Sequence, residues 1–361
     1  MKISHARTRV LRTPADNPLV VGIPQPGTRE FVTLELDTDE GIQGVGVTFF
    51  GGALTQALKQ AVDDLAALII GDDPMLVEAI TAKLRRAAAS AGPGGVFTLA
   101  LSAIDIALWD IKGKALNQPV SALLGGYRDR MPTYASGALM RPFNIEYLAE
   151  AGPRLVGMGF RQMKTQLGAE PSVAKAVERI KVLREGIGDD IDLMCDINQL
   201  WSVNQAIDIG TRLEDYHLFW LEDVVAHDDY QGLARVADAL TTPIAAGEYV
   251  YGIVPFRNMV EHRSIDIVMV DVLRVGGITQ FRKVAGMAEA FNLPVVSHLV
   301  PEIQVHTMTA IPNGLTVEYM PWTLRLWEET PAIEDGQIVV PQKPGLGLQF
   351  SQDAFRQYQI G

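Results

Sequence analysis

The sequence predicts an α/β fold in which an N-terminal α+β unit precedes a barrel of parallel strands. Three observations support this prediction. Strand-like segments come first, and helix-like segments follow them up to about residue 125. Short apolar runs then alternate with helical periods as far as about residue 325. Eight such runs occur, and they are continuous and rich in Val, Ile or Leu, as is typical of strands buried on both faces.

The N-terminal unit is expected to span residues 1–125. Residues 3–13 and 29–50 alternate apolar and polar side chains around an Asp-Glu-Gly turn, which predicts an antiparallel sheet. Strands followed by helices indicate an α+β domain, and the Pro- and Gly-containing tail, residues 326–361, is expected to return to it. The helical period appears in residues 55–69, 74–89 and 97–117.

Residues 126–325 are expected to form the catalytic barrel. No glycine-rich phosphate turn follows an early strand, which favours a closed barrel over an open, doubly wound sheet. The eight predicted strands cover residues 132–139, 160–167, 192–199, 219–225, 243–248, 266–272, 294–300 and 315–320.

Composition excludes several classes of function. The net charge is -12 and Lys and Arg are not clustered, which argues against nucleic acids and anionic membranes as partners. The start MKISHARTRV lacks an apolar stretch and no run of about eighteen apolar residues follows, so we expect no signal peptide, no membrane span and a cytoplasmic location. The single cysteine, Cys195, lies in an apolar run and is expected to be buried.

Ionisable residues end seven consecutive predicted strands of the barrel. Active sites of barrels lie at the C-terminal ends of the strands, so these side chains are expected to meet in one mouth. Their separations of 20 to 32 residues each match about one βα unit. The seven residues are Lys164, Asp196, Glu222, Glu248, Asp271, His298 and Glu318.

Asp196, Glu222 and Glu248 end three successive strands, and their carboxylates should therefore converge on one rim. Converging carboxylates repel one another unless a cation lies among them. Oxygen ligands favour Mg²⁺, with Mn²⁺ as an alternative, whereas a zinc site would use His or Cys. One acid alone would more often cap a helix or face solvent. The three together predict a magnesium site.

Asp271 and His298 end neighbouring strands and predict an acid–base pair. A carboxylate that holds one imidazole nitrogen raises the basicity of the other, as proton transfer near neutral pH requires. Lys164 and Gln166 share one face of an earlier strand, because side chains alternate with period two. Both should therefore point into the same mouth, opposite His298.

The motifs MKTQ, CDIN, WLED, AAGE, DVLRVGGIT, SHL and TVEY resemble, in order, those of the mandelate racemase and muconate lactonising branch of the enolase superfamily. The resemblance covers nearly the whole length. It implies a (β/α)7β barrel of the TIM type with a capping α+β domain, and Mg²⁺ held by Asp196, Glu222 and Glu248. It also implies a small-molecule carboxylate substrate and a homo-oligomer.

The resemblance also implies roles for individual side chains. His298 with Asp271 resembles the base, and Lys164 resembles the lysine that touches the substrate carboxylate. A protonated Glu318 would hydrogen-bond the developing enediolate oxygen, and Asn198 would reach a substrate hydroxyl. The loops at residues 17–28 and 48–52 are expected to close over the barrel.

Gln166 departs from the family pattern. Racemases of the family usually carry Lys-x-Lys on this strand, and an amide cannot serve as a base. With His298 alone as base, we expect dehydration of a sugar acid, an aldonate or aldarate. The alternatives are a one-base epimerase or racemase, a lactone cycloisomerase, and a catalytically idle binding protein. Arg141 and Arg325 are candidates for binding a second carboxylate, although solvated arginines would look the same.

Overall fold

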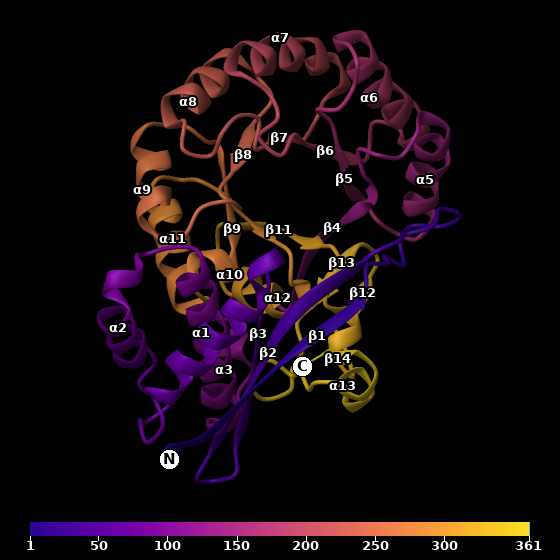
Figure 1. Cartoon of the computed structure of the whole chain (residues 1–361). Helices are drawn as coiled ribbons and strands as arrows, with labels where there is room; N and C mark the ends of the chain where they lie inside the picture. The colour runs from indigo at the N-terminus through magenta and orange to yellow at the C-terminus, as the bar shows by residue number, and fades with distance from the viewer. Residues whose placement is uncertain (361) are drawn as a thin grey trace.

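Residues 1–360 are described by a computed structural model, in which the N-terminal strands form an antiparallel sheet (Figure 1). The sheet has the order β14-β1-β2-β3, so its fourth strand comes from the C-terminal tail. The register pairs Val10 of β1 with Val32 of β2. The N-terminal strands are β1 (Ile3–Pro14), β2 (Thr28–Thr38) and β3 (Gln43–Thr48).

Helices cover the side of this sheet that faces the barrel. The long helix α3 is buried along almost its whole length because it packs between β3 and the barrel helices α10 and α11. Gly46 permits this approach, since a Cβ atom there would lie 2.0 Å from the carbonyl oxygen of Ala103. The helices are α1 (Thr55–Ala67), α2 (Val77–Ala87), α3 (Val96–Ala115) and α4 (Val120–Leu123).

Eight parallel strands form a closed barrel, which confirms the predicted fold class. The ring closes where β11 pairs with β4, through Val317 and Thr133. Every predicted strand is present within one or two residues of its expected start. The strands are β4 (Arg130–Leu139), β5 (Gln162–Gln166), β6 (Asp192–Asp196), β7 (Trp220–Glu222), β8 (Ile244–Ala246), β9 (Ile267–Asp271), β10 (Val295–His298) and β11 (Gly314–Tyr319).

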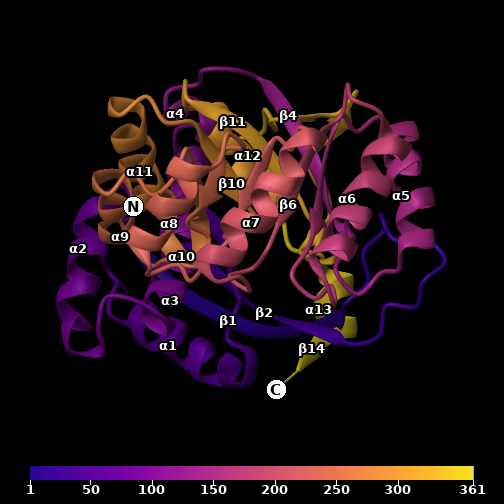
Figure 2. The ribbon, with the colours of Figure 1, turned by 90° about the horizontal axis from the view of Figure 1, so that it is seen from above.

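Helices alternate with these strands and surround the barrel, as Figures 1 and 2 show. The short α10 follows β9 directly, and its N-terminus is capped by the side chain of Asp271. The helices are α5 (Ile145–Gly157), α6 (Val173–Ile187), α7 (Val203–Leu213), α8 (Tyr230–Ala239), α9 (Val254–Glu261), α10 (Val272–Val275), α11 (Ile278–Ala290) and α12 (Pro301–Thr309). Short 3-10 segments occur at Gly52–Leu54, Ala89–Ala91, Glu214–Tyr216 and Leu324–Leu326.

The C-terminal tail contacts both parts of the molecule. Strands β12 (Ile333–Glu334) and β13 (Gln337–Val339) form a hairpin, and β13 pairs with β4 of the barrel. Helix α13 (Gln352–Tyr358) and β14 (Gln359–Ile360) then pack on β1. The first half of the tail therefore extends the barrel sheet, and the second half joins the N-terminal sheet. The division at residues 125 and 325 stays a prediction.

Two expectations about single features can be compared with the structure. Cys195 is fully buried as a free thiol, and burial raises its pKa well above the usual value, as expected of a small apolar side chain. None of the helices within residues 1–360 has the length and apolar character that crossing a membrane requires.

Candidate active site

The register of the barrel places the predicted site residues in two rows at the C-terminal ends of the strands. Gln166 pairs with Asp196 across β5 and β6, and Asp196 pairs with Glu222 across β6 and β7. Asp271 pairs with His298 across β9 and β10. Side chains at paired positions of adjacent parallel strands point to the same side of the sheet. The two rows therefore face each other across the mouth.

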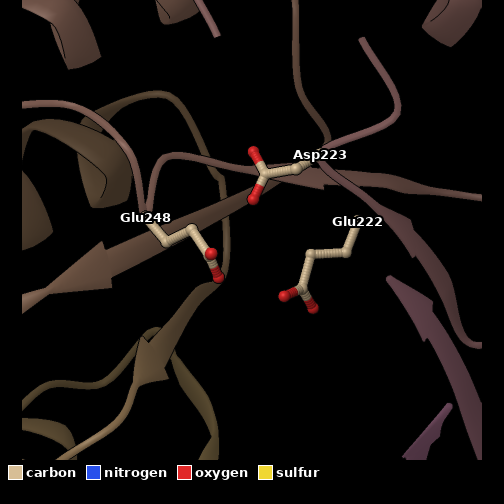
Figure 3. Close-up of side chains that lie close together, drawn as sticks. All are labelled: Glu222, Asp223 and Glu248. Carbon is tan, nitrogen blue, oxygen red and sulfur yellow. The ribbon is translucent and has the colours of Figure 1, made fainter. Parts of the chain in front are cut away.

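Three carboxylates meet on one rim, as Figure 3 shows. Glu222, Asp223 and Glu248 each offer one oxygen, and these oxygens lie within 4.8 Å of one another. The sequence analysis missed Asp223, although it directly follows Glu222 in the WLED motif. If side chains kept alternating along the strand, the side chain of Asp223 would point away from that of Glu222. Strand β7 ends at Glu222, however, and the positive φ of 44° at Asp223 redirects its carboxylate to the same group.

Asp196 lies beside this group and has hydrogen-bond partners of its own. Its Oδ1 accepts a bond from the backbone amide of Asn198 at 2.8 Å. Its Oδ2 accepts bonds from the side-chain amides of Asn198 at 2.8 Å and Gln166 at 3.3 Å. Burial and the charge of Glu248 raise the pKa of Asp196 to about 6, although Lys164 opposes the shift. The expected set of three acids thus has a fourth neighbour, Asp223.

The electrostatics of this rim fit a divalent cation. Burial first, and then the neighbouring carboxylates, raise the pKa values of Glu222 and Asp223 well above the usual range. Neither oxygen of Asp223 accepts a hydrogen bond within residues 1–360. Buried carboxylate oxygens without donors are costly, and a hard cation with oxygen ligands, such as Mg²⁺ or Mn²⁺, would satisfy them.

Lys164 lies between the two sides of the mouth. Its Nζ is 2.6 Å from Oε1 of Glu222 and 2.9 Å from Oε1 of Glu318. Burial disfavours the ammonium, but these two carboxylates outweigh burial and raise the pKa of Lys164 well above its usual value. The side chain is therefore a fixed positive charge. The other oxygen of Glu222 accepts a bond from the indole of Trp220 at 2.9 Å.

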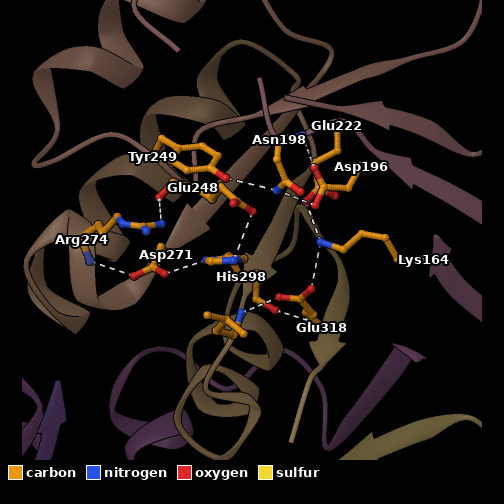
Figure 4. A network of polar contacts seen from close by, with 12 residues as sticks. Lys164, Asp196, Asn198, Glu222, Glu248, Tyr249, Asp271, Arg274, His298 and Glu318 are labelled. Carbon is orange, nitrogen blue, oxygen red and sulfur yellow. Dashed lines mark hydrogen bonds and ion pairs between the residues drawn. The ribbon is translucent and has the colours of Figure 1, made fainter. Parts of the chain in front are cut away.

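Asp271 and His298 form a buried pair on the opposite side (Figure 4). Nδ1 of His298 is 2.6 Å from Oδ2 of Asp271, and Nε2 lies 3.2 Å from Oε2 of Glu248. The other oxygen of Asp271 accepts the backbone amides of Leu273 and Arg274, both at 2.8 Å. Burial lowers the pKa of His298, but Glu248 and Asp271 outweigh it, so the net shift is upward. The imidazole is therefore suited to hold a proton.

Glu318 has contacts that favour its charged form, although a protonated side chain was expected. Burial raises its pKa, but the charges of Lys164 and His298 outweigh burial and lower it. Its Oε2 also accepts the backbone amide of Leu299 at 2.7 Å. The lysine contact thus favours the carboxylate form, and the expected protonated Glu318 stays a prediction.

Polar side chains continue along the mouth beyond Asp196. Gln166 donates to Oδ1 of Asn198 at 3.0 Å, and Asn198 donates to the hydroxyl of Tyr249 at 3.1 Å. Arg141 reaches the same place, but its donors are engaged with the carbonyl oxygen of Leu167 at 2.7 Å and with Asn198 at 3.1 Å. Tyr249 was missed by the sequence analysis, and its position directly after Glu248 was the available signal.

The remaining expectations concern the N-terminal unit and Arg325. Arg325 forms an ion pair with Asp16 on the surface, so the structure does not bring it to the acidic rim. In the loop at residues 17–28, Asn17 donates to the carbonyl oxygen of Ser136 in β4 at 3.3 Å. In the loop at residues 48–52, the ring of Phe50 stacks on His298, with 6.2 Å between the ring centres.

Comparisons with known proteins find relatives over most of the chain. Residues 4–125 match the N-terminal domain of the mandelate racemase / muconate lactonizing enzyme family, and residues 146–354 match the enolase C-terminal domain-like family. A 3,6-anhydro-alpha-L-galactonate cycloisomerase of Streptomyces coelicolor is 35% identical over 88% of both chains. An L-talarate/galactarate dehydratase of Salmonella typhimurium is 32% identical over 97% of this chain and 88% of its own.

A solved structure extends the likeness to the whole fold. The L-talarate dehydratase of Polaromonas sp. JS666, complexed with Mg and L-glucarate, superposes with a TM-score of 0.92 at 31% identity. The match covers 100% of this chain and 99% of the other. Homologues are therefore dehydratases and cycloisomerases of sugar acids, and their structures include magnesium complexes. The chain belongs to the mandelate racemase / muconate lactonizing enzyme family of the enolase superfamily.

Proposed function

We propose that this enzyme removes the proton α to the carboxylate of a sugar acid, an aldonate or aldarate, and then expels the β-hydroxyl as water. The observation that carries the proposal is the Asp271–His298 pair, which lies 2.6 Å apart and faces Lys164 across a rim of buried carboxylates. An imidazole held by a carboxylate on one nitrogen can transfer protons at the other.

The proposed metal ligands are Asp196, Glu222 and Glu248. Their oxygen chemistry, their burial and the donor-free oxygens of the neighbouring Asp223 support a hard divalent cation, Mg²⁺ or Mn²⁺. When bound, the ion supplies positive charge that stabilises the dianion formed as the α-proton leaves. Asp223 lies in the same group, and its carboxylate would add negative charge next to the ion.

The chain's own residues carry the remaining steps. Nε2 of His298 accepts the α-proton, and the electron pair of the broken C–H bond forms an enediolate. Lys164 contacts the substrate carboxylate and stabilises its added charge, which is worth about 3 kcal/mol for a typical contact of this kind. The C–O bond to the β-hydroxyl then breaks while His298 returns its proton to the departing oxygen. The resulting enol becomes a keto acid.

Gln166 and Asn198 are proposed to bind substrate hydroxyls. Their amides already form a chain that runs from Asp196 to the Tyr249 hydroxyl. Burial and the nearby acids raise the pKa of Tyr249 above its usual value, so its hydroxyl keeps its proton and can donate a hydrogen bond. Arg141 holds Asn198 in place, and this contact supports its assignment to the binding region.

The test is turnover of a panel of aldonic and aldaric acids with Mg²⁺. We expect a keto acid, detected as its semicarbazone, with one acid at least tenfold better than the rest. The His298→Asn variant should give none, and an exposed histidine changed in the same way, His262→Asn, should behave like the unaltered enzyme. Absence of product with every acid would overturn the proposal.

A second candidate is cycloisomerisation of a lactone or anhydro sugar acid. The 35% identical Streptomyces coelicolor relative carries that activity in its name, and Gln166 leaves His298 as a single base, which this reaction requires. The product separates the two reactions. A dehydratase releases water and forms a keto acid, whereas a cycloisomerase gives an isomer of unchanged mass.

A cytoplasmic location and a homo-oligomeric state are further proposals. The cationic Lys164 in the mouth supports a small carboxylate as the substrate. Size-exclusion chromatography with light scattering would determine the oligomeric state.

A further inference from the structure

Arg274 is a cation in the mouth that the proposed chemistry does not use. It lies in the last turn of α10, three residues after Asp271, and is partly buried. Burial alone would lower its pKa, but the charges of Asp271 and Glu248 outweigh burial and raise it. Arg274 is therefore a fixed positive charge between the imidazole side and the carboxylate rim.

The main chain of Arg274 holds the carboxylate of the acid–base pair. Its backbone amide donates to Oδ1 of Asp271 at 2.8 Å, and Oδ2 of the same carboxylate is 2.6 Å from Nδ1 of His298. The orientation of the imidazole thus depends on the position of the first turn of α10. Any displacement of Arg274 would be passed to His298 through Asp271.

The guanidinium of Arg274 contacts two other elements. Nη1 donates to the carbonyl oxygen of Glu248 at 2.7 Å, which ties α10 to the end of β8. The plane of the guanidinium lies over the ring of Phe50, with 3.8 Å between its central carbon and the ring centre. Arg274 therefore joins the barrel to a residue of the N-terminal unit through a cation–π contact.

Phe50 in turn covers the imidazole. Its ring lies 6.2 Å from that of His298, and the two planes are within 10° of parallel. Phe50 has a positive φ of 72°, which is unfavourable for a bulky side chain and persists only where surrounding contacts enforce it. Gly51 and Gly52 follow directly, so the backbone around Phe50 has little stiffness of its own. Two contacts hold the ring in this position: Arg274 on the barrel side, and the ring of Phe49, whose centre is 4.4 Å away.

We infer that Arg274 is a positioning residue that clamps Phe50 of the N-terminal unit over His298 while its backbone amide orients Asp271. Closure of the loop at residues 48–52 and alignment of the acid–base pair are then coupled, because both depend on Arg274. The inference rests on the proposed function, because it takes His298 as the base. Loss of the guanidinium contacts would uncover the pair and remove one restraint on the turn that orients Asp271.

The experiment is a double-mutant cycle with Arg274→Lys and Phe50→Leu. Lysine keeps the charge and can still reach the Glu248 carbonyl, but it lacks the planar group that stacks on the ring. Each single variant should lower kcat/KM about tenfold, within the range of about 2- to 30-fold typical of one cation–π contact. The double variant should be no worse than either single one, because both changes remove the same contact.

Hydrogen exchange provides a readout that does not require turnover. Amides of residues 48–52 should exchange faster in Arg274→Lys and in Phe50→Leu, while the barrel strands keep the protection of the unaltered enzyme. The matched control is Arg282→Lys, which alters a guanidinium 5.5 Å from the Trp109 ring, away from the mouth. This control should change neither the loop exchange nor kcat/KM.

Three results would overturn the inference: single effects that multiply in the double variant, loop exchange that is unchanged in Arg274→Lys, or loss of protection throughout the barrel. Loss of protection throughout the barrel would mean that Arg274 stabilises the fold as a whole. If the unaltered enzyme turns over no acid of the panel, the proposed function fails. The exchange measurements still decide whether the clamp exists, so the two failures remain distinguishable.

Discussion

Buried ionisable groups occur in two regions of the molecule, and the two regions treat them differently. At the seam between the N-terminal unit and the tail, Asp110 is fully buried and every oxygen has a donor. Its Oδ1 accepts the amide of Leu346 at 2.8 Å. Its Oδ2 accepts the amide of Val45 at 3.0 Å and the ammonium of Lys114 at 2.6 Å. His306 of α12 is also satisfied, by the Ser121 amide and the Leu346 carbonyl oxygen.

The mouth of the barrel contrasts with the seam. Asp223 is equally buried, yet neither of its oxygens accepts a hydrogen bond within residues 1–360. Burial and the neighbouring carboxylates raise the pKa values of three acids of the rim, Asp196, Glu222 and Asp223. A buried charge that its own chain satisfies holds segments together, whereas a buried charge left without partners indicates a ligand. Asp110 therefore has a structural role, whereas the donor-free carboxylate of Asp223 points to a cation at the rim, beside Asp196 and Glu222, whose oxygens do have donors.

Replacing the imidazole should have the largest effect. His298→Asn is expected to lower kcat about 10³-fold, because general acid–base catalysis by a positioned side chain contributes about 10² to 10⁴. Exchange of the substrate α-proton in D₂O, followed by NMR, measures the same step. The melting temperature should stay nearly unchanged, since asparagine fills much of the same space. Persistent α-proton exchange would show that another group is the base.

Removing a satisfied acid of the seam should affect stability instead of chemistry. Asp110→Ala is expected to lower the free energy of unfolding by about 4 kcal/mol, because it leaves two buried amides and an ammonium without their acceptor. Urea unfolding measures the change, and Asp64→Ala on the exposed face of α1 is the control. A loss below about 1 kcal/mol would contradict the structural role of Asp110.

The buried His306 at the seam should make the stability of the fold depend on pH. Burial lowers the pKa of His306 from 6.5 to about 4 in the folded chain. The unfolded chain therefore binds more protons between these values, and stability is lost as the pH falls from about 6.5 to about 4. The total loss from this residue is about 3 kcal/mol. Urea unfolding at several pH values should show a shallower acid limb in His306→Gln. An unaltered acid limb would contradict the prediction.

The smallest effect concerns metal binding at the mouth. Mg²⁺ at about 100 times its Kd should stabilise the fold by about 2.7 kcal/mol, which corresponds to about 4 °C in melting temperature. Glu222→Gln and Glu248→Gln should each abolish this rise, while Asp64→Asn should keep it. Asp196→Asn should abolish it as well, because Asp196 and Glu222 are register partners on adjacent strands. If Asp223→Asn loses the Mg²⁺-dependent rise and Asp196→Asn keeps it, then Asp223, and not Asp196, is the metal ligand.

The sequence alone determined the barrel and the order of its strand-end residues. Continuous apolar runs define buried parallel strands, and parallel strands bring their C-terminal ends to one edge. The pairing of Asp271 with His298 and of Asp196 with Glu222 follows from that rule, because each pair lies at equivalent positions of neighbouring strands. Such inferences need only local periodicity and strand direction.

Tertiary structure decided the contacts that local periodicity does not describe. Asp223 joins the rim through a positive φ, and Phe50 reaches His298 only because the N-terminal unit packs against the barrel. The lowered pKa of Glu318 depends on Lys164, 2.9 Å away on another strand. Side-chain packing between distant segments and burial set these features. Both arise when the chain closes on itself, so the order of the residues does not reveal them.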